Sequence, residues 1–435
     1  MAEAPISVEA QPVRASLVAR LVGDRLIRNN AIYLAGSLGV GVVGYVFHFA
    51  TGRLLGPASY AVVAAMVSAL SLLSLPSIVL QTTAARYTSL LTARSDPGAI
   101  RRLLLQLSLA CLLGVLVMGG VLIALAPAVA GYLHIADARL VYLLALASAL
   151  GLLVAITRGA LQGLRRFVAL SLNILLDMTT RVVVAVGLIL GGFGTMGAGI
   201  ALAAGPIIAY TQSLYPLRRF ARSSTTTSPP LTDVGRYTLS AIVAAAGITY
   251  LLNIDVILAK HYLPSHESGL YAAGAVLGRV IFFLGMTVAS VMFPEVTLLH
   301  ARGETHFHVV EKSLLLLGIL STGFVLGYAL LPSLVIGPFG ANFTQVGPYL
   351  VFFAIALSFF AISVLFVNYF LSINNRRFII PLVAAAALET VLIMAFHAGP
   401  RQVVTMVLLS MAALLAMLTL LYVVDRFGMM RTAPA

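Results

Sequence analysis

The sequence contains no tryptophan, one cysteine and few charged residues. Only 9% of its 435 residues are Asp, Glu, Lys or Arg, 60% are hydrophobic, and the mean hydropathy is +1.04. Because soluble domains carry about 25% charged residues, this composition excludes the soluble class. With Cys111 as the one cysteine, an internal disulfide and a cysteine-based zinc cluster are both excluded.

Basic residues outnumber acidic ones by 27 to 14, which gives a formal net charge of +13. Such a surplus can indicate nucleic-acid binding. Here, however, the basic residues are scattered in short segments between apolar runs and do not form one patch. We therefore expect no nucleic-acid partner.

Apolar runs of about 20 residues recur along the chain, and each can cross a hydrocarbon core about 30 Å thick. The sequence therefore predicts an all-α polytopic membrane protein with 12 transmembrane helices. The predicted spans are residues 30–52, 60–90, 102–128, 139–160, 168–191, 195–218, 237–259, 269–297, 312–331, 347–372, 378–396 and 402–423.

The orientation follows from the positive-inside rule. With a cytoplasmic N-terminus, the inner segments hold 21 of the 27 basic residues, the outer segments hold 4, and 2 lie within spans. This bias predicts a multi-pass protein whose N- and C-termini are both cytoplasmic.

A polar linker divides the chain. Its central run SSTTTSPP cannot form a packed element, so residues 220–236 are predicted to be a cytoplasmic linker. It separates an N-lobe of six spans, residues 29–219, from a C-lobe of six, residues 237–423. Residues 424–435 would form a cytoplasmic tail.

Residues 1–28 are predicted to be a cytoplasmic N-terminal segment. From Pro12 to Arg28, apolar and arginine residues alternate at helical spacing. This pattern suits a helix lying on an anionic leaflet, and it equally suits a cationic flank that orients the first span.

The two halves share a weak internal repeat. Tyr60 and Tyr271 are 211 residues apart, Asp177 and Glu389 are 212 apart, and an Arg-Arg-Phe tripeptide opens the fifth and eleventh spans. Concordant offsets indicate a duplication, and copies of six spans each are related by an axis along the membrane normal. The sequence therefore predicts two pseudo-symmetric six-helix lobes around a central cavity.

Four charged residues surround the hairpins that follow the first and seventh spans. Asp255 and Arg279 lie inside apolar runs, where an ionised side chain costs about 3 kcal/mol or more unless it is paired or hydrated. Arg53 and Lys260 lie at the outer ends of their spans. If all four face one cavity, they form a net cationic chamber suited to a diphosphate, because guanidinium groups match phosphate oxygens. Arg86 would extend this lining inward.

A structural interpretation remains open for the same residues. Asp255 and Arg279 could pair with each other, while Arg53 and Lys260 extend outward to the membrane surface. Arg86 would then be an interfacial anchor.

Three more charged residues lie within spans. Asp177 and Arg181 are spaced i,i+4, which predicts an ion pair within the fifth span. Glu389 has no such partner in its own span. It suits either a site that couples transport to a proton or a packing contact with a polar group of another helix.

A membrane enzyme, such as a glycosyltransferase, polymerase or ligase, is the main rival class. The outer loops have about 4 to 16 residues and are too short to fold alone. No DxD-like acidic motif, nucleophile elbow or phosphate loop is present. We therefore expect a transporter, with no catalytic residue, no metal site and no cofactor.

The two hairpins carry the elements L-L-G-P-x-x-Y, from Leu54 to Tyr60, and G-L-Y-x-A, from Gly269 to Ala273. With the apolar runs around them, they resemble the polysaccharide and O-antigen flippases. That family belongs to the multidrug/oligosaccharidyl-lipid/polysaccharide exporter superfamily. The similarity extends from about Arg28 to Tyr422.

The resemblance implies a flippase that moves an undecaprenyl-diphosphate-linked oligosaccharide from the inner to the outer leaflet by alternating access, for cell-surface polysaccharide synthesis. It implies a bacterial inner (cytoplasmic) membrane, and it places Arg53, Arg279 and Lys260 where the family's cavity charges lie. The implied partners are the lipid-linked oligosaccharide, membrane lipids, a coupling ion (H⁺ or Na⁺) and other polysaccharide-assembly proteins.

Three alternatives remain. A cation-coupled multidrug exporter of the same superfamily also has 12 helices. A lipid II flippase fits less well, because those flippases look like fourteen-helix proteins. A membrane glycan polymerase or ligase fits least.

Overall fold

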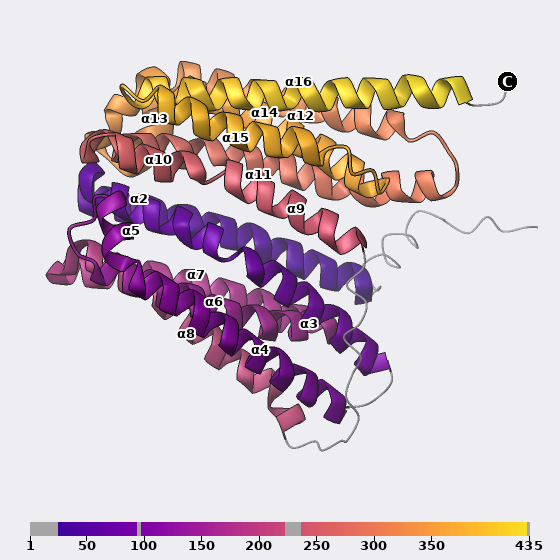
Figure 1. Cartoon of the computed structure of the whole chain (residues 1–435), viewed down its shortest axis with the longest axis horizontal. Helices are drawn as coiled ribbons and strands as arrows, with labels where there is room; N and C mark the ends of the chain where they lie inside the picture. Colours follow the sequence, from indigo (N-terminus) through magenta and orange to yellow (C-terminus); the bar gives the residue numbers. More distant parts are fainter. Residues whose placement is uncertain (1–24, 94–96, 222–235, 433–435) are drawn as a thin grey trace, which may run out of the picture.

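The computed structural model describes residues 25–93, 97–221 and 236–432, and its regular elements in these ranges are all helices (Figure 1). The predicted N-terminal segment up to residue 24 and linker residues 222–235 lie outside them. The predicted all-α fold of two lobes is confirmed.

The described residues of the N-lobe form seven α-helices and one π-helical turn. These are α2 (Arg25–Leu73), α3 (Leu75–Ala93), α4 (Pro97–Ala124), α5 (Ala126–Tyr132), α6 (Arg139–Gly163), α7 (Phe167–Leu188), η1 (Ile189–Phe193) and α8 (Gly194–Ala221).

The C-lobe contains eight α-helices and two 3₁₀ turns. These are α9 (Arg236–Leu251), α10 (Ile254–Tyr262), α11 (Ser265–Ala301), α12 (Phe307–Leu330), α13 (Pro332–Ile336), η2 (Gly337–Phe339), η3 (Ala341–Val346), α14 (Gly347–Ser372), α15 (Ile379–Ala395) and α16 (Pro400–Thr432).

Within the described ranges, nine helical segments are long and apolar enough to cross a membrane, and a tenth apolar helix is shorter. Two of the nine segments join neighbouring predicted spans through a kink: one joins the fifth and sixth spans, and the other joins the first span to the first half of the second. One kink lies at Gly56, whose φ of 72° favours glycine, and the other lies at Gly192 and Gly194. The 12 predicted spans are thereby accounted for.

Several boundaries differ from the prediction. The second span, predicted to be continuous over residues 60–90, is interrupted at Ser74, between the end of α2 and the start of α3. The seventh span, predicted to be continuous, is broken at Leu252 and Asn253 into α9 and α10. No proline or glycine marks this break in the sequence. At the chain's end, α16 continues to Thr432, through most of the predicted tail.

The two lobes lie side by side and diverge toward one end of the molecule (Figure 1). The end where they meet carries the turns at Gly56 and Pro264, and we call it the outer end, following the orientation predicted from the arginine distribution. The described chain begins and ends near the opposite, inner end.

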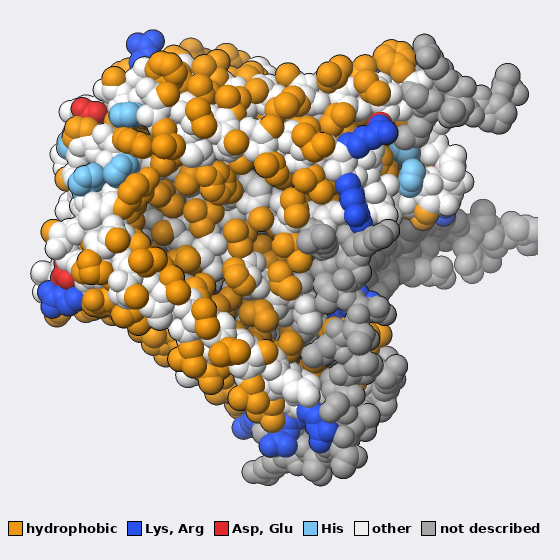
Figure 2. Space-filling view, in the orientation of Figure 1, with side chains coloured by type: hydrophobic (Ala, Val, Ile, Leu, Met, Phe, Trp, Pro, Cys, Tyr) orange, Lys and Arg blue, Asp and Glu red, His pale blue; other side chains and the backbone are white. Residues whose placement is uncertain are grey.

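Large apolar side chains cover much of the outside of the bundle, while lysine and arginine lie mainly toward its two ends (Figure 2). Leu113 on α4, Leu330 on α12 and Ile380 on α15 are 67%, 75% and 77% exposed. Exposed apolar surface of this extent would aggregate in water, so it indicates contact with lipid.

Helices α3 and α6 approach closely through glycines. A Cβ added at Gly159 or Gly163 would lie 2.3 or 2.4 Å from the carbonyl oxygen of Gln81 or Ala85. Small residues permit such backbone contact in membranes, where packing supplies much of the attraction between helices.

We predict that Gly159→Leu destabilises the N-lobe by roughly 1–3 kcal/mol, because the new side chain must push α3 away. Gly151→Leu on the same helix is the matched control, since open space surrounds that position. Thermal unfolding of both purified variants tests this, and equal melting temperatures would contradict it.

Candidate functional site

The outer end is closed by an aromatic plug, which we define as Phe339 and Phe343 of the loop between α12 and α14. Both phenyl rings are buried against Tyr60 of α2, with ring centroids 5.5 and 5.8 Å away. Gly52 leaves room for the plug, because a Cβ there would lie 2.5 Å from Phe339. The plug thus fills the seam between the lobes at the outer end.

The backbone also meets at this seam. A Cβ added at Gly269, near the start of α11, would lie 1.8 Å from the carbonyl oxygen of Pro57. The two hairpins predicted to be copies of each other therefore touch directly.

Below the seam lies a cavity of about 510 Å³ between the lobes. Its wall on the N-lobe side runs from Ser71 to Ile78, and its C-lobe wall comes from α9, α11 and α14. Asn253 lines the outer part of the cavity. Its inner part is lined by Ala241 and Leu371, which lie near the inner ends of α9 and α14.

The cavity wall combines apolar surface with neutral polar groups. Phe282, Phe283 and Met286 supply the large apolar side chains, and serine, threonine and asparagine supply the hydrogen-bonding groups. Among the described residues that line it, none is charged. Such a lining suits a bulky, partly apolar molecule.

Arg279 lies at the outer end of this cavity. Its guanidinium donates a hydrogen bond to the backbone carbonyl of Leu252, which the break between α9 and α10 leaves free. Leu252 itself lines the cavity, as do Phe282 and Phe283, one turn further along α11. Arg279 also lies close enough to His48 of α2 to interact electrostatically.

Asp255 and Arg279 do not form a direct ion pair: no contact of up to 4.0 Å joins their charged atoms in the described structure. Asp255 is buried and accepts a hydrogen bond of 2.9 Å from the Tyr271 hydroxyl. Its second carboxyl oxygen, Oδ1, has no hydrogen-bond partner in the described part of the chain. The predicted structural pair is therefore replaced by separate partners.

Glu389 of α15 is fully buried, and neither of its carboxyl oxygens has a hydrogen-bond partner among the described residues. It lies near Asp255, close enough for the two carboxyl groups to interact. Buried polar atoms without partners are rare and costly, so this carboxyl pair suits a site that holds a proton or a cation.

The other predicted cavity residues lie elsewhere. Arg53 is exposed at the outer end, beside Gly340, and Arg86 is exposed on α3. Lys260 is buried and donates a hydrogen bond of 3.3 Å to the Ser265 hydroxyl. The structure does not bring these three residues together with Arg279 in one chamber, and their role in binding stays a prediction.

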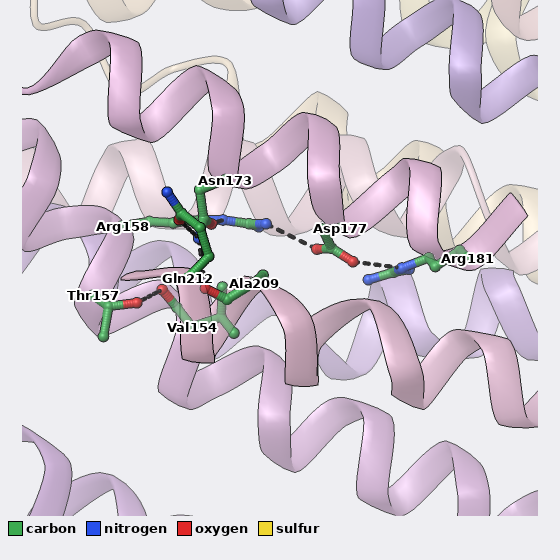
Figure 3. A network of polar contacts seen from close by, with 8 residues as sticks. All are labelled: Val154, Thr157, Arg158, Asn173, Asp177, Arg181, Ala209 and Gln212. Atoms are coloured by element: carbon green, nitrogen blue, oxygen red, sulfur yellow. Dashed lines mark hydrogen bonds and ion pairs between the residues drawn. The ribbon is translucent and has the colours of Figure 1, made fainter. Parts of the chain in front are cut away.

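The N-lobe contains a polar network centred on Asp177 (Figure 3). The predicted ion pair with Arg181 is present at 2.8 Å, and Arg158 of α6 forms a second ion pair of 2.8 Å with the same carboxylate. Arg158 also bonds Asn173, whose amide donates to the Ala209 carbonyl and to Gln212 of α8.

This network joins α6, α7 and α8, so we interpret it as structural. Gly205 of α8 permits it, because a Cβ there would lie 2.3 Å from Asp177 Oδ1. No spacing signal in the sequence links Arg158 to Asp177, because the two residues lie on different helices. His48 was missed in the same way; its Nδ1 lies 3.0 Å from the Tyr60 hydroxyl.

Comparison with solved structures identifies the fold. The chain is similar to the inward-facing conformation of a multidrug resistance MATE family transporter of the MOP superfamily, with a TM-score of 0.76, 12% identity, and coverage of 90% of this chain and 96% of that one. No protein-family model and no curated protein matches the sequence.

Other conformations and relatives match less well. An outward-facing MATE structure gives a TM-score of 0.55 at 16% identity, over 93% of this chain and 97% of that one. A eukaryotic MATE transporter gives 0.55 at 14% identity, over 92% and 96%. The chain thus has the fold of the MATE transporters, in an arrangement most like the inward-facing one among these three.

We predict that Asp177→Asn destabilises the protein by roughly 3–5 kcal/mol, because it leaves two guanidinium groups in the N-lobe without a carboxylate. Asp137→Asn is the matched control: it removes an ion pair with Arg139 that lies on the surface, and we expect no measurable change. Thermal unfolding in detergent measures both, and similar melting temperatures for the two variants would refute the structural interpretation.

Proposed function

We propose that this chain is an alternating-access transporter that moves its substrate through the cavity between the lobes toward the outer side. The observation that carries the proposal is a cavity below a closed outer seam, with lobes that diverge toward the inner end. Substrate would enter from the inner side, and opening of the seam would release it outward.

The first candidate substrate is an amphipathic organic compound. This agrees with the MATE structures of similar fold, one of which is described as a multidrug resistance transporter. The aromatic residues Phe282 and Phe283 offer stacking surfaces, and Asn253, Thr249 and Asn368 offer hydrogen bonds without a fixed charge pattern. A lining of this kind accepts varied molecules.

The second candidate is the lipid-linked oligosaccharide, moved across the bacterial inner membrane. Two observations favour it: Arg279 binds the backbone carbonyl of Leu252, a residue that lines the cavity, and the described lining contains no acid that would attract a cationic drug. An apolar groove of about 660 Å³ between α9 and α15 lies on the opposite face of α9 and suits a hydrocarbon chain. Polysaccharide-assembly partners are expected only with this substrate.

We assign coupling to the buried carboxyl pair Asp255 and Glu389. Their unpartnered oxygens can hold H⁺, or Na⁺ with oxygen ligands from neighbouring groups. The pair lies in the C-lobe, and the charge of Arg279 would stabilise the ionised form of Asp255. Exchange of the ion for substrate would then drive the cycle.

We predict that Arg279→Ala reduces transport of an anionic substrate about tenfold or more, the size expected from loss of a charge-assisted hydrogen bond. Arg279→Lys should retain part of the activity. In a strain carrying Arg279→Ala, accumulation of undecaprenyl-diphosphate-linked glycan would support the flippase, whereas sensitivity to cationic dyes without accumulation would support the drug exporter. Normal transport of both substrates would remove Arg279 from the mechanism.

We predict that Glu389→Gln abolishes the dependence of transport on the ion gradient, because the amide cannot exchange a proton and carries no charge to bind a cation. Uptake into inside-out vesicles, measured with and without an imposed pH or sodium gradient, tests this. Glu295→Gln is the control, since that exposed glutamate lies toward the inner end of α11. A gradient response in Glu389→Gln equal to that of the unmodified protein would exclude Glu389 from coupling.

A further inference from the structure

The short helix α10 touches both the coupling pair and the outer seam. It is a separate nine-residue helix because the chain breaks at Leu252 and Asn253. Asp255 lies in its first turn and His261 in its last, six residues or about 9 Å of helix rise apart. A movement of the Asp255 end of α10 must therefore displace the His261 end.

At its outer end, α10 contacts the N-lobe. The ring of His261 stacks on that of Tyr132, with centroids 3.9 Å apart and planes 7° from parallel, and its Nδ1 donates a 2.7 Å hydrogen bond to the Tyr132 carbonyl. The ring of His134 lies 5.5 Å from that of His261. We call His261, Tyr132 and His134 the histidine latch, because they join the lobes across the seam.

The outer end of α10 also contacts the C-terminal end of α15. Tyr262 stacks on His397, with ring centroids 4.2 Å apart, and His397 lies two residues beyond the end of α15. Since Glu389 lies on α15, the same two helices meet at the carboxyl pair and again at the outer end.

At its inner end, α10 holds Asp255 beside Glu389. If both carboxyl groups were ionised, they would repel each other, and three of their four oxygens have no hydrogen-bond partner in the described structure. The observed closeness of α10 and α15 is therefore the arrangement expected when the pair holds a proton or a cation.

Other titratable groups lie on α10 and on the neighbouring helices, and half of them are tyrosines. Arg279 is the cation that acts on Asp255, and it favours the ionised form when the bound proton or cation leaves. The groups are Tyr271 and Arg279 on α11, Tyr250 on α9, Lys260 on α10, and His48 and Tyr60 on α2.

We infer that α10 is a lever that links the charge of the Asp255–Glu389 pair to the histidine latch. Loss of the neutralising proton or cation drives the inner end of α10 away from α15. The helix then pivots, and its outer end withdraws His261 from Tyr132, which opens the outer seam. The inference rests on the proposed function, because only in an alternating-access transporter does this seam serve as a gate.

The test uses a cysteine reporter in the seam. Phe343→Cys, in a Cys111→Ser background, places a thiol at a position that is fully buried while the seam is closed. A membrane-impermeant maleimide added to intact cells then labels the reporter only when the outer seam opens. Ser268→Cys, next to the Pro57–Gly269 contact, is a second reporter in case the first disturbs the plug.

We expect His261→Ala to raise the labelling rate about fivefold, the factor that corresponds to one net hydrogen bond. The combined change Asp255→Asn and Glu389→Gln, which mimics the neutralised pair, should lower the rate. In a protein that already carries His261→Ala, the same combined change should have little effect on the labelling rate, because the latch through which it acts has been removed. His266→Ala, an exposed histidine at the same end, is the control and should match the parent.

Two outcomes would overturn the lever. One is a labelling rate in His261→Ala equal to that of the parent with both reporters, in a protein whose melting temperature is unchanged. The other is independent, multiplicative effects of the latch and carboxyl changes, which would show that the two sites are not coupled. If labelling behaves as expected while no substrate is transported, the proposed function fails and the lever stands.

Discussion

The close contact of the two outer hairpins is the constraint on which the rest of the structure depends. Because Gly269 has no side chain, the start of α11 can rest on the Pro57 carbonyl, and Gly52 similarly accepts Phe339. These contacts fix the lobes to each other at one end, and their divergence toward the other end leaves the cavity between them. A side chain at either glycine would separate the lobes where they now meet.

The charged residues within the membrane-spanning helices have different partners in the two lobes. The N-lobe satisfies its acid with two arginines and an asparagine, which ties three helices into one rigid unit. The C-lobe keeps two acids without such partners, while its guanidinium binds a backbone carbonyl at a helix break. Because unpaired buried charges are expensive, the C-lobe is the part whose stability depends on what its acids bind.

Much of the fold could be predicted from the sequence because it depends on local patterns. The length of the apolar runs defined the spans, and the i,i+4 spacing of Asp177 and Arg181 predicted an ion pair that is present at 2.8 Å. The contribution of Arg158 could not be predicted, since it comes from another helix and depends on how α6 packs against α7.

The candidate site was predicted less completely, for a related reason. Arg279 and Asp255 were recognised because charge is rare within spans. Their hydrogen-bond partners, Tyr271 and Leu252, could not be predicted. These contacts depend on the break in the seventh span, and no glycine or proline in the sequence indicates that break. Arg53 and Lys260 were grouped with them by position along the chain, but one side chain is exposed and the other bonds Ser265. Position along the chain predicts how deep a residue lies in the membrane, but it does not predict the direction in which the side chain points around the helix axis. That direction keeps Arg53 and Lys260 apart from Arg279 and Asp255.

The Asp177 network has a consequence for the history of the chain. The repeat offset of 212 residues predicts that Asp177 and Glu389 are counterparts. Asp177 lies between two guanidinium groups, whereas Glu389 has no hydrogen-bond partner among the described residues. Under the predicted duplication, the two copies of one acid differ in their partners: the N-lobe copy belongs to a network that joins three helices, and in the described structure the C-lobe copy has no hydrogen-bond partner. Because Arg158 and Arg181 pair with Asp177, the N-lobe acid is part of a fixed contact between helices. Under the proposed function, its C-lobe counterpart is the one that binds and releases an ion.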